Sequence, residues 1–144
     1  MATVFTKLNE GWNAEPNAPD PHAAVAGPDV TLNFLASPFQ FPKFPAGQIL
    51  RLRFKDASRF RLGGTNDEGW YRGQCRFSGI APAWGEFYEV TGDLELSQCP
   101  DDWIVVSDNP IAGLRHFLFY LRDETFECTA ADWTCEMLPL PQGG

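Results

Sequence analysis

The sequence predicts a mainly β fold, either an antiparallel β-sandwich or a flattened barrel, formed as a single domain over residues 1–144 with one short C-terminal helix. Apolar side chains recur with a period of two far more often than with the 3.6-residue period of a helix. The 13 glycines and 12 prolines divide the chain into short alternating segments. Short alternating segments separated by turn signals are typical of all-β domains.

The N-terminal third combines a proline-rich segment with the first predicted strand. Residues 11–28 contain four prolines and few large apolar side chains, so we expect an extended loop or arm there. Residues 30–35 alternate weakly and are expected to form a strand. Residues 37–47 contain three prolines, which cannot donate hydrogen bonds to a β-ladder. This segment is therefore expected to be a sheet edge or a polyproline-like stretch.

The clearest strand pattern follows, over residues 49–55. Three apolar side chains, at positions 50, 52 and 54, alternate there with three cations. After a turn at residues 56–58, residues 59–62 resume the same alternation. The sequence predicts a hairpin over residues 48–62 that has one buried apolar face and one solvated basic face.

Further strands are expected in the middle of the chain. Residues 70–78 favour a strand interrupted by a glycine, and residues 103–107 favour a short β-branched strand. Residues 86–91 and 94–98 flank a Gly-Asp dipeptide, which predicts a second hairpin.

The C-terminal part is expected to contain two strands and the helix. Residues 116–122 are apolar between a histidine and an arginine at their ends, as in a central strand covered on both faces, and residues 125–128 return after a turn. Thr129, followed by Asp132 at the third position, resembles a helix N-cap. Residues 133–138 are therefore expected to form about two helical turns, ended by prolines.

The sequence contains no established catalytic or cofactor-binding motif. It lacks the glycine-rich dinucleotide pattern, the phosphate-binding loop, the HExxH zinc motif and the GxSxG nucleophile motif. Of the two histidines, His22 lies in the proline-rich segment and His116 opens an apolar strand, where a packed histidine is commoner than a base. The four cysteines lack the spacing of a zinc site. We predict no cofactor and no metal ion.

The same features predict a cytoplasmic location without membrane contact. No apolar run approaches the roughly 18 residues that a transmembrane helix needs. The first ten residues lack the apolar stretch of a secretory signal. In that compartment the thiols are expected to be reduced. They are Cys75, Cys99, Cys128 and Cys135.

Charge is unevenly distributed along this acidic chain, whose formal net charge is −8. Residues 48–76 carry a net charge of +4, which makes their arginines the candidates for anion binding. These candidates are Arg51, Arg53, Arg59 and Arg61. We favour the alternative that they pair with acids on a neighbouring strand, because unpaired like charges on one sheet face repel. The net negative charge also disfavours nucleic acid as a partner.

Residues 86–136 carry a net charge of −10 and interleave acids with aromatic residues. An acidic surface attracts basic partners, and Trp and Tyr are favoured at protein contacts. The leading hypothesis is a non-enzymatic binding protein, such as an inhibitor or an immunity-type protein, that presents an acidic, aromatic-containing surface to a basic protein partner. The predicted binding residues are Trp70, Tyr71, Trp84, Glu86, Tyr88, Glu89 and Trp103.

Two alternatives remain open. A carbohydrate- or small-ligand-binding β-domain would use some of the same aromatic residues as a stacking platform. These are Trp70, Tyr71, Trp84 and Trp103. A carboxylate-based hydrolase would need two acids that converge in a pocket. The candidate acids are Glu86, Glu89 and Glu95 on the second predicted hairpin, and Glu124 and Glu127 on the last strand pair.

Overall fold

In the computed structural model of the chain, residues 4–63, 85–92, 103–110, 113–121 and 124–140 are described. All described strands pair antiparallel, in two sheets that do not close into a barrel, and the described part contains no helix. None of the described segments is a helix that could span a membrane. The sequence-based expectation of a mainly β, two-sheet architecture is confirmed, whereas the barrel alternative and the C-terminal helix are wrong.

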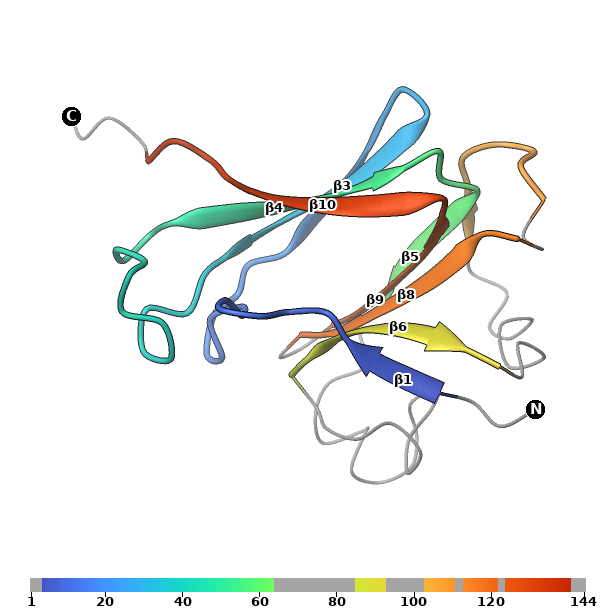
Figure 1. Ribbon diagram of the computed structural model, residues 1–144. Coiled ribbons are helices and arrows are strands. Elements are labelled where there is room, and N and C mark those ends of the chain that lie inside the picture. Colours follow the sequence, from blue (N-terminus) through green and yellow to red (C-terminus); the bar gives the residue numbers. More distant parts are fainter. Residues whose placement is uncertain (1–3, 64–84, 93–102, 111–112, 122–123, 141–144) are drawn as a thin grey trace.

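The two sheets form two layers (Figure 1). The larger sheet has the strand order β1 (Val4–Lys7), β6 (Phe87–Thr91), β8 (Arg115–Tyr120), β9 (Thr125–Ala130), β5 (Arg59–Gly63) and β7 (Ile104–Val105). The smaller sheet has the order β10 (Asp132–Met137), β4 (Ile49–Lys55), β3 (Asp29–Leu35) and β2 (His22–Ala26).

The strongly alternating strand β4 behaves as its side-chain pattern predicts. Leu50, Leu52 and Phe54 are at most 1 % exposed, while the cations between them lie on the opposite face. The predicted hairpin over residues 48–62 is wrong, however. β4 pairs with β3 and β10, whereas β5 pairs with β9 and β7 in the other sheet. A period of two specifies which face is buried, but it does not specify which strand lies alongside.

The turn after β4 carries the chain from one sheet to the other. Asp56 has a φ of +50°, a left-handed conformation that Asp tolerates better than most residues. The N–H of Ala57 then donates to the carbonyl of Pro28, which precedes β3. The N–H of Ser58 donates to the carbonyl of Thr129 in β9. The two successive donors therefore bind opposite sheets.

The predicted C-terminal helix is instead the strand β10. Thr129 belongs to β9, and its hydroxyl lies 3.1 Å from Nδ1 of His116, so it caps no helix. Residues 132–137 pair with β4 over six residues in continuous register. The helix signal was short, and about two turns of helix gain little compared with a complete ladder of backbone hydrogen bonds.

The central strands of the larger sheet match their prediction. Residues 116–120 of β8 are buried on both faces, and β9 returns antiparallel beside it. The short strand expected at residues 103–107 is confirmed only at Ile104–Val105. Two further predicted strands, residues 70–78 and 94–98, lie outside the described part of the chain. Residues 94–98 were expected to pair with β6, but β6 has β1 on one side and β8 on the other.

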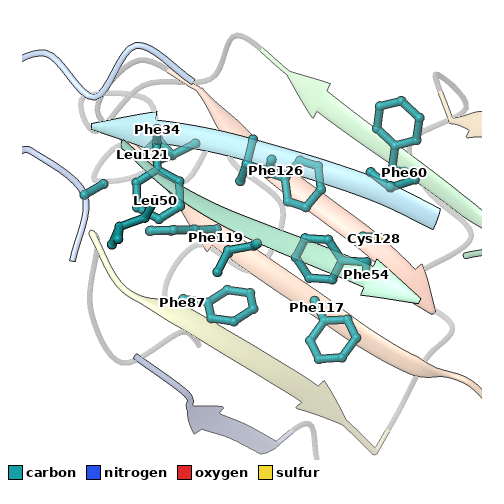
Figure 2. Close-up of a cluster of buried hydrophobic side chains, with 14 of the residues drawn as sticks. Phe34, Leu50, Phe54, Phe60, Phe87, Phe117, Phe119, Leu121, Phe126 and Cys128 are labelled. Atoms are coloured by element: carbon teal, nitrogen blue, oxygen red, sulfur yellow. The ribbon is translucent and has the colours of Figure 1, made fainter. Parts of the chain in front are cut away.

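Phenylalanines dominate the core between the sheets (Figure 2). Rings from the smaller sheet meet rings from the larger one, for example Phe54 against Phe117 at 5.2 Å between ring centroids and Phe34 against Phe119 at 5.3 Å. Such tilted and edge-to-face pairs add to the stabilisation from burial alone. This packing fixes how the sheet ends, and therefore the loops there, lie relative to one another.

The proline-rich segment over residues 11–28 is part of this assembly and not an arm. Trp12 is 8 % exposed and packs against Phe34, Phe87 and Phe119. Backbone hydrogen bonds join residues 13–19 to the end of β3, and residues 22–26 form β2. Few large apolar residues occur there, but a single tryptophan is enough to anchor the segment in the core.

Candidate functional site

The structure places the predicted binding residues in different environments. Trp70, Tyr71 and Trp84 lie outside the described residues. Tyr88 is 3 % exposed and packs edge-on against Phe5 in a second apolar cluster, on the face of the larger sheet that points away from the main core. Tyr88 is therefore a packing residue and presents no surface to a partner.

Glu86, by contrast, lines a pocket. Its carboxylate is about one-fifth exposed, and its Oε2 accepts a hydrogen bond of 2.8 Å from the side-chain amide of Asn9. Oε2 also lies 3.5 Å from Nζ of Lys7, at the end of the edge strand β1. Oε1 has no hydrogen-bond partner among the described residues. One carboxylate oxygen is thus held in place, and the other is available to a ligand.

The orientation of Glu86 depends on Asn9, a residue that sequence reasoning missed. Asn9 is 3 % exposed, and its amide nitrogen also donates to the carbonyl of Trp12. Its amide oxygen accepts the N–H of Phe87. A buried amide with both ends satisfied is rigid, so it fixes the carboxylate to which it donates.

The pocket beside Glu86 has a volume of about 520 Å³, and its walls expose polar and apolar surface in similar amounts. The polar side chains that line it are Asn13, Glu15, Asn17, Gln40, Glu86 and Tyr120. It therefore contains two carboxylates and three amides, and none of its described lining residues is a cation.

Two distant loops build the pocket. The amide of Asn13 donates to the carbonyl of Gly85, 72 residues away in sequence, and its oxygen accepts the N–H of Ala14. Gly85 has a φ of +85°, a conformation in which glycine avoids the strain of a side chain. Both oxygens of Glu15 accept main-chain N–H groups, from Asn17 and Ala18. The pocket walls are therefore set by hydrogen bonds before any ligand arrives.

An exposed aromatic residue lies in the loop that contributes Gln40. Phe39 is 73 % exposed, the most exposed of the large apolar residues described. Sequence reasoning treated this proline-rich loop as a sheet edge or a polyproline-like stretch and named no binding residue in it. The exposure of Phe39 could have been inferred from its position between prolines. Prolines cannot donate to a β-ladder, so the ring has no sheet face on which to pack.

Glu89 is engaged within the protein. Both of its carboxylate oxygens bind the guanidinium of Arg115, at 3.0 and 2.7 Å. Arg115 also donates to Asp132 of β10 at 2.8 Å, and it thereby links the two sheets. The hydrogen bond to Glu89 raises the pKa of Arg115, although partial burial opposes the shift. Glu89 is thus a structural acid of the sheet interface.

Trp103 is half-buried beside β5, next to a second pocket of about 540 Å³. The guanidinium of Arg59 lies 4.0 Å from the centre of its ring, in a cation–π contact. The ring of Trp103 also meets His116 edge-on at 6.0 Å. A sugar therefore has at most one face of this ring to stack on.

The four candidate anion-binding arginines do not form one basic face. Arg51 and Arg53 lie on the outer face of the smaller sheet, and Arg59 and Arg61 belong to the larger sheet. Neighbouring strands supply partners to three of them. These contacts are Arg51 with Asn33 at 2.9 Å, Arg53 with Asp29 at 3.3 Å and Arg61 with Glu127 at 3.0 Å. The favoured interpretation, pairing with acids on adjacent strands, holds for Arg53 and Arg61.

Two of the carboxylates named for a hydrolase are engaged within the protein. Glu127 is fully buried between His116 and Arg61, and Glu89 is bound to Arg115. Glu95 lies outside the described residues. The pocket does bring Glu15 and Glu86 together, but main-chain N–H groups occupy both oxygens of Glu15. This arrangement presents no acid–base pair to a substrate.

Within the described ranges, no group of three or more His, Cys, Asp and Glu side chains is arranged to hold a metal ion. The two cysteines described, Cys128 and Cys135, form no disulfide. Comparison of the chain with protein-family models, with curated proteins and with solved structures finds no match.

Proposed function

We propose that this chain is a non-enzymatic binding protein, of the inhibitor or immunity type, that engages a basic protein partner. The pocket beside Glu86 would receive a lysine or arginine side chain of that partner. The observation that carries the proposal is the carboxylate of Glu86, which is held by Asn9 through one oxygen and has its other oxygen without a described hydrogen-bond partner.

The pocket chemistry favours a cation. Two carboxylates contribute negative charge, and the oxygens of the lining amides can accept the remaining N–H donors of a guanidinium or ammonium group. A neutral or anionic group would leave Glu86 with only its long, solvated contact to Lys7 as a compensating charge. The overall charge of −8 adds long-range attraction for a basic partner.

Lys7 supports the same assignment. Its ammonium group already lies 3.5 Å from Glu86, and its side chain is 55 % exposed. The protein thus places a cation of its own at this carboxylate, in a long and solvated contact that a partner's cation can replace at little cost.

Phe39 supplies an exposed aromatic group in the same loop as Gln40. Aromatic residues that become buried on association often dominate the binding energy. An acidic pocket next to a loop with an exposed ring suits a partner segment that combines a cation with an apolar neighbour.

A carbohydrate ligand is the second candidate, because amides and carboxylates are also the groups that bind sugar hydroxyls. One titration separates the two. Backbone amide NMR spectra would be recorded while acetyl-arginine-amide, acetyl-lysine-amide or a panel of monosaccharides is added. We expect shifts at Asn13, Gly85 and Glu86 with the two cations and none with the sugars.

The matched variants are Glu86→Gln and Asp108→Asn. Glu86→Gln keeps the shape of the side chain and removes its charge, so the arginine derivative should bind about tenfold more weakly, equivalent to 1.4 kcal/mol. Asp108 is an exposed acid at the second pocket, and its amide variant should bind like the wild type. Equal effects of the two variants would contradict the proposal, and shifts with a sugar alone would transfer it to the carbohydrate class.

A further inference from the structure

The open edge of β10 differs from the other sheet edges. Edge strands expose unpaired main-chain groups, which proteins commonly protect with prolines, lysines or short strand length. The described edge strand β1 contains Lys7, and β7 is two residues long. β2 is bracketed by Pro21 and Pro28. β10 runs for six residues without a lysine or a proline, and it has a proline beyond one end only, Pro139.

The register shows which main-chain groups of β10 face outward. The N–H of Leu138 donates to the carbonyl of Ile49, its register partner, so the hydrogen-bonded pairs of this ladder involve the even-numbered residues of β10. The N–H and C=O groups of the odd-numbered residues therefore point to the open edge. These residues are Trp133, Cys135 and Met137. The N–H of Trp133 already donates to Oδ1 of Asp132 at 2.8 Å, so the N–H groups available to a new strand are those of Cys135 and Met137.

Both ends of β10 are held against β4. The N–H of Ala131 donates to the carbonyl of Lys55, and the amide of Gln48 donates to the carbonyl of Leu138 at 2.7 Å. An edge fixed in this way is already extended, so a strand that docks there orders only itself.

The two faces of β10 carry different chemistry. Asp132, Thr134 and Glu136 lie on the outer face of the smaller sheet, opposite Lys55, Arg53 and Arg51 of β4. The odd-numbered side chains lie on the other face, where Trp133 packs against Phe87 and Met137 is 60 % exposed. A strand that docks beside β10 meets the carboxylate of Glu136 on one face and apolar groups on the other. Asp132 adds negative charge to the first face, but its Oδ1 already binds Arg115.

We propose that the open edge of β10 accepts an extended segment of alternating basic and apolar residues, which adds a fifth strand to the smaller sheet. β4 shows that such a segment fits, because its Arg51 and Lys55 lie directly across from Glu136 and Asp132. A second copy of β10 fits less well, since it would bring two acidic strands together. The inference extends the proposed function, since its partner is also basic, but it uses a surface that does not line the Glu86 pocket.

The test uses the full-length protein and a fluorescently labelled six-residue peptide of alternating valine and arginine. Fluorescence anisotropy should show binding that weakens with salt. A peptide with glutamate in place of arginine should not bind. A peptide N-methylated on the residues whose N–H groups would donate to β10 should lose at least about tenfold in affinity, because it cannot complete the ladder.

Two lysine variants locate the binding. Met137→Lys places a cation on the proposed edge, and Val25→Lys makes the same change at an exposed position, 51 % exposed, on β2 at the opposite edge of this sheet. Met137→Lys should weaken peptide binding about tenfold or more, while Val25→Lys should leave it unchanged. On binding, the amide hydrogens of Cys135 and Met137 should become protected from exchange, whereas that of Trp133 already donates to Asp132.

Three outcomes would overturn the inference: equal effects of the two lysine variants, undiminished binding of the N-methylated peptide, or a protein dimer that Met137→Lys dissociates. Glu86→Gln should leave peptide binding to the edge unchanged. Loss of edge binding in Met137→Lys together with normal arginine binding at the pocket therefore separates this inference from the proposed function.

Discussion

Glu127, which is fully buried, lies with its Oε1 2.9 Å from Nε2 of His116. Its other oxygen accepts a hydrogen bond from Arg61 at 3.0 Å, and Nδ1 of His116 contacts the hydroxyl of Thr129. The network joins β5, β8 and β9 on the face of the larger sheet that points away from the main core. This network stabilises the fold, and its residues do not line the proposed binding site.

Removal of the Glu127 carboxylate should therefore be costly. Glu127→Ala removes the fully buried carboxylate that both Arg61 and His116 contact, so we expect a loss of about 3–5 kcal/mol in the free energy of unfolding. Glu136→Ala removes an exposed acid and should change stability by less than about 0.5 kcal/mol. Urea unfolding of the two variants checks this, and comparable losses would show that Glu127 contributes no more than a surface acid.

Arg115 should contribute to the attachment between the sheets. Its guanidinium makes three charge-assisted hydrogen bonds, two to Glu89 and one to Asp132, but the side chain is about one-third exposed. We expect Arg115→Met to cost about 1–2 kcal/mol, with a smaller loss at high salt. The control is Arg53→Met, whose single ion pair at 3.3 Å lies within one sheet and should be worth less than about 1 kcal/mol. Equal losses at all salt concentrations would contradict this role.

Because the N–H groups of β10 point alternately to β4 and away from it, two adjacent proline substitutions should lower the stability of the protein by unequal amounts. Thr134→Pro removes an N–H that points to β4 and should destabilise the protein by about 1–3 kcal/mol. Cys135→Pro removes an outward N–H and should be better tolerated. Thermal unfolding of the pair distinguishes them, and the reverse order would mean that the register of this ladder is wrong.

Burial of Cys128 predicts a loss of stability at alkaline pH. Removal from water raises the pKa of this thiol, because the thiolate is disfavoured in the apolar core. Its stabilising contribution is complete below the unfolded-state pKa of about 8.5, and it falls by about 1.4 kcal/mol per pH unit above that value. Unfolding free energies between pH 8 and 10 should therefore decline less steeply in Cys128→Ala than in the wild type. Parallel profiles would contradict the assignment.

Cys135 is expected to be a slow nucleophile in spite of its exposed position. Partial desolvation of the thiol, with a further contribution from the charge of Glu136, raises its pKa to about 11. Little thiolate is then present at pH 8, so alkylation should be about tenfold slower than for a free cysteine. Mass spectrometry after timed alkylation measures the rate at this position. Labelling as fast as a free thiol would show that the group is fully solvated.

The sequence was informative where burial is periodic. The alternation of β4 identified Leu50, Leu52 and Phe54 as core residues, and the continuous apolar run of β8 identified a strand buried on both faces. Tyr88 was predicted to contact a partner because it lies among acids in the sequence, but it is buried, since both faces of the sheet are covered at β6.

Strand partners and the pocket could not be predicted in this way. β4 and β5 are adjacent in sequence but belong to different sheets, because the contacts of Ala57 and Ser58 depend on distant carbonyls. The pocket depends on Asn9, Asn13 and Gly85, which are brought together across more than 70 residues and have no characteristic local spacing. Among the predicted binding residues that the structure describes, Glu86 alone lines the pocket.

The most direct test of the central claim is calorimetric titration of acetyl-arginine-amide into the wild type and Glu86→Gln at low and moderate ionic strength. Capture of a cation by the Glu86 carboxylate predicts measurable binding that weakens as salt is added, and an affinity about tenfold lower in the variant. Binding that is indifferent to both salt and the loss of this carboxylate would contradict the claim.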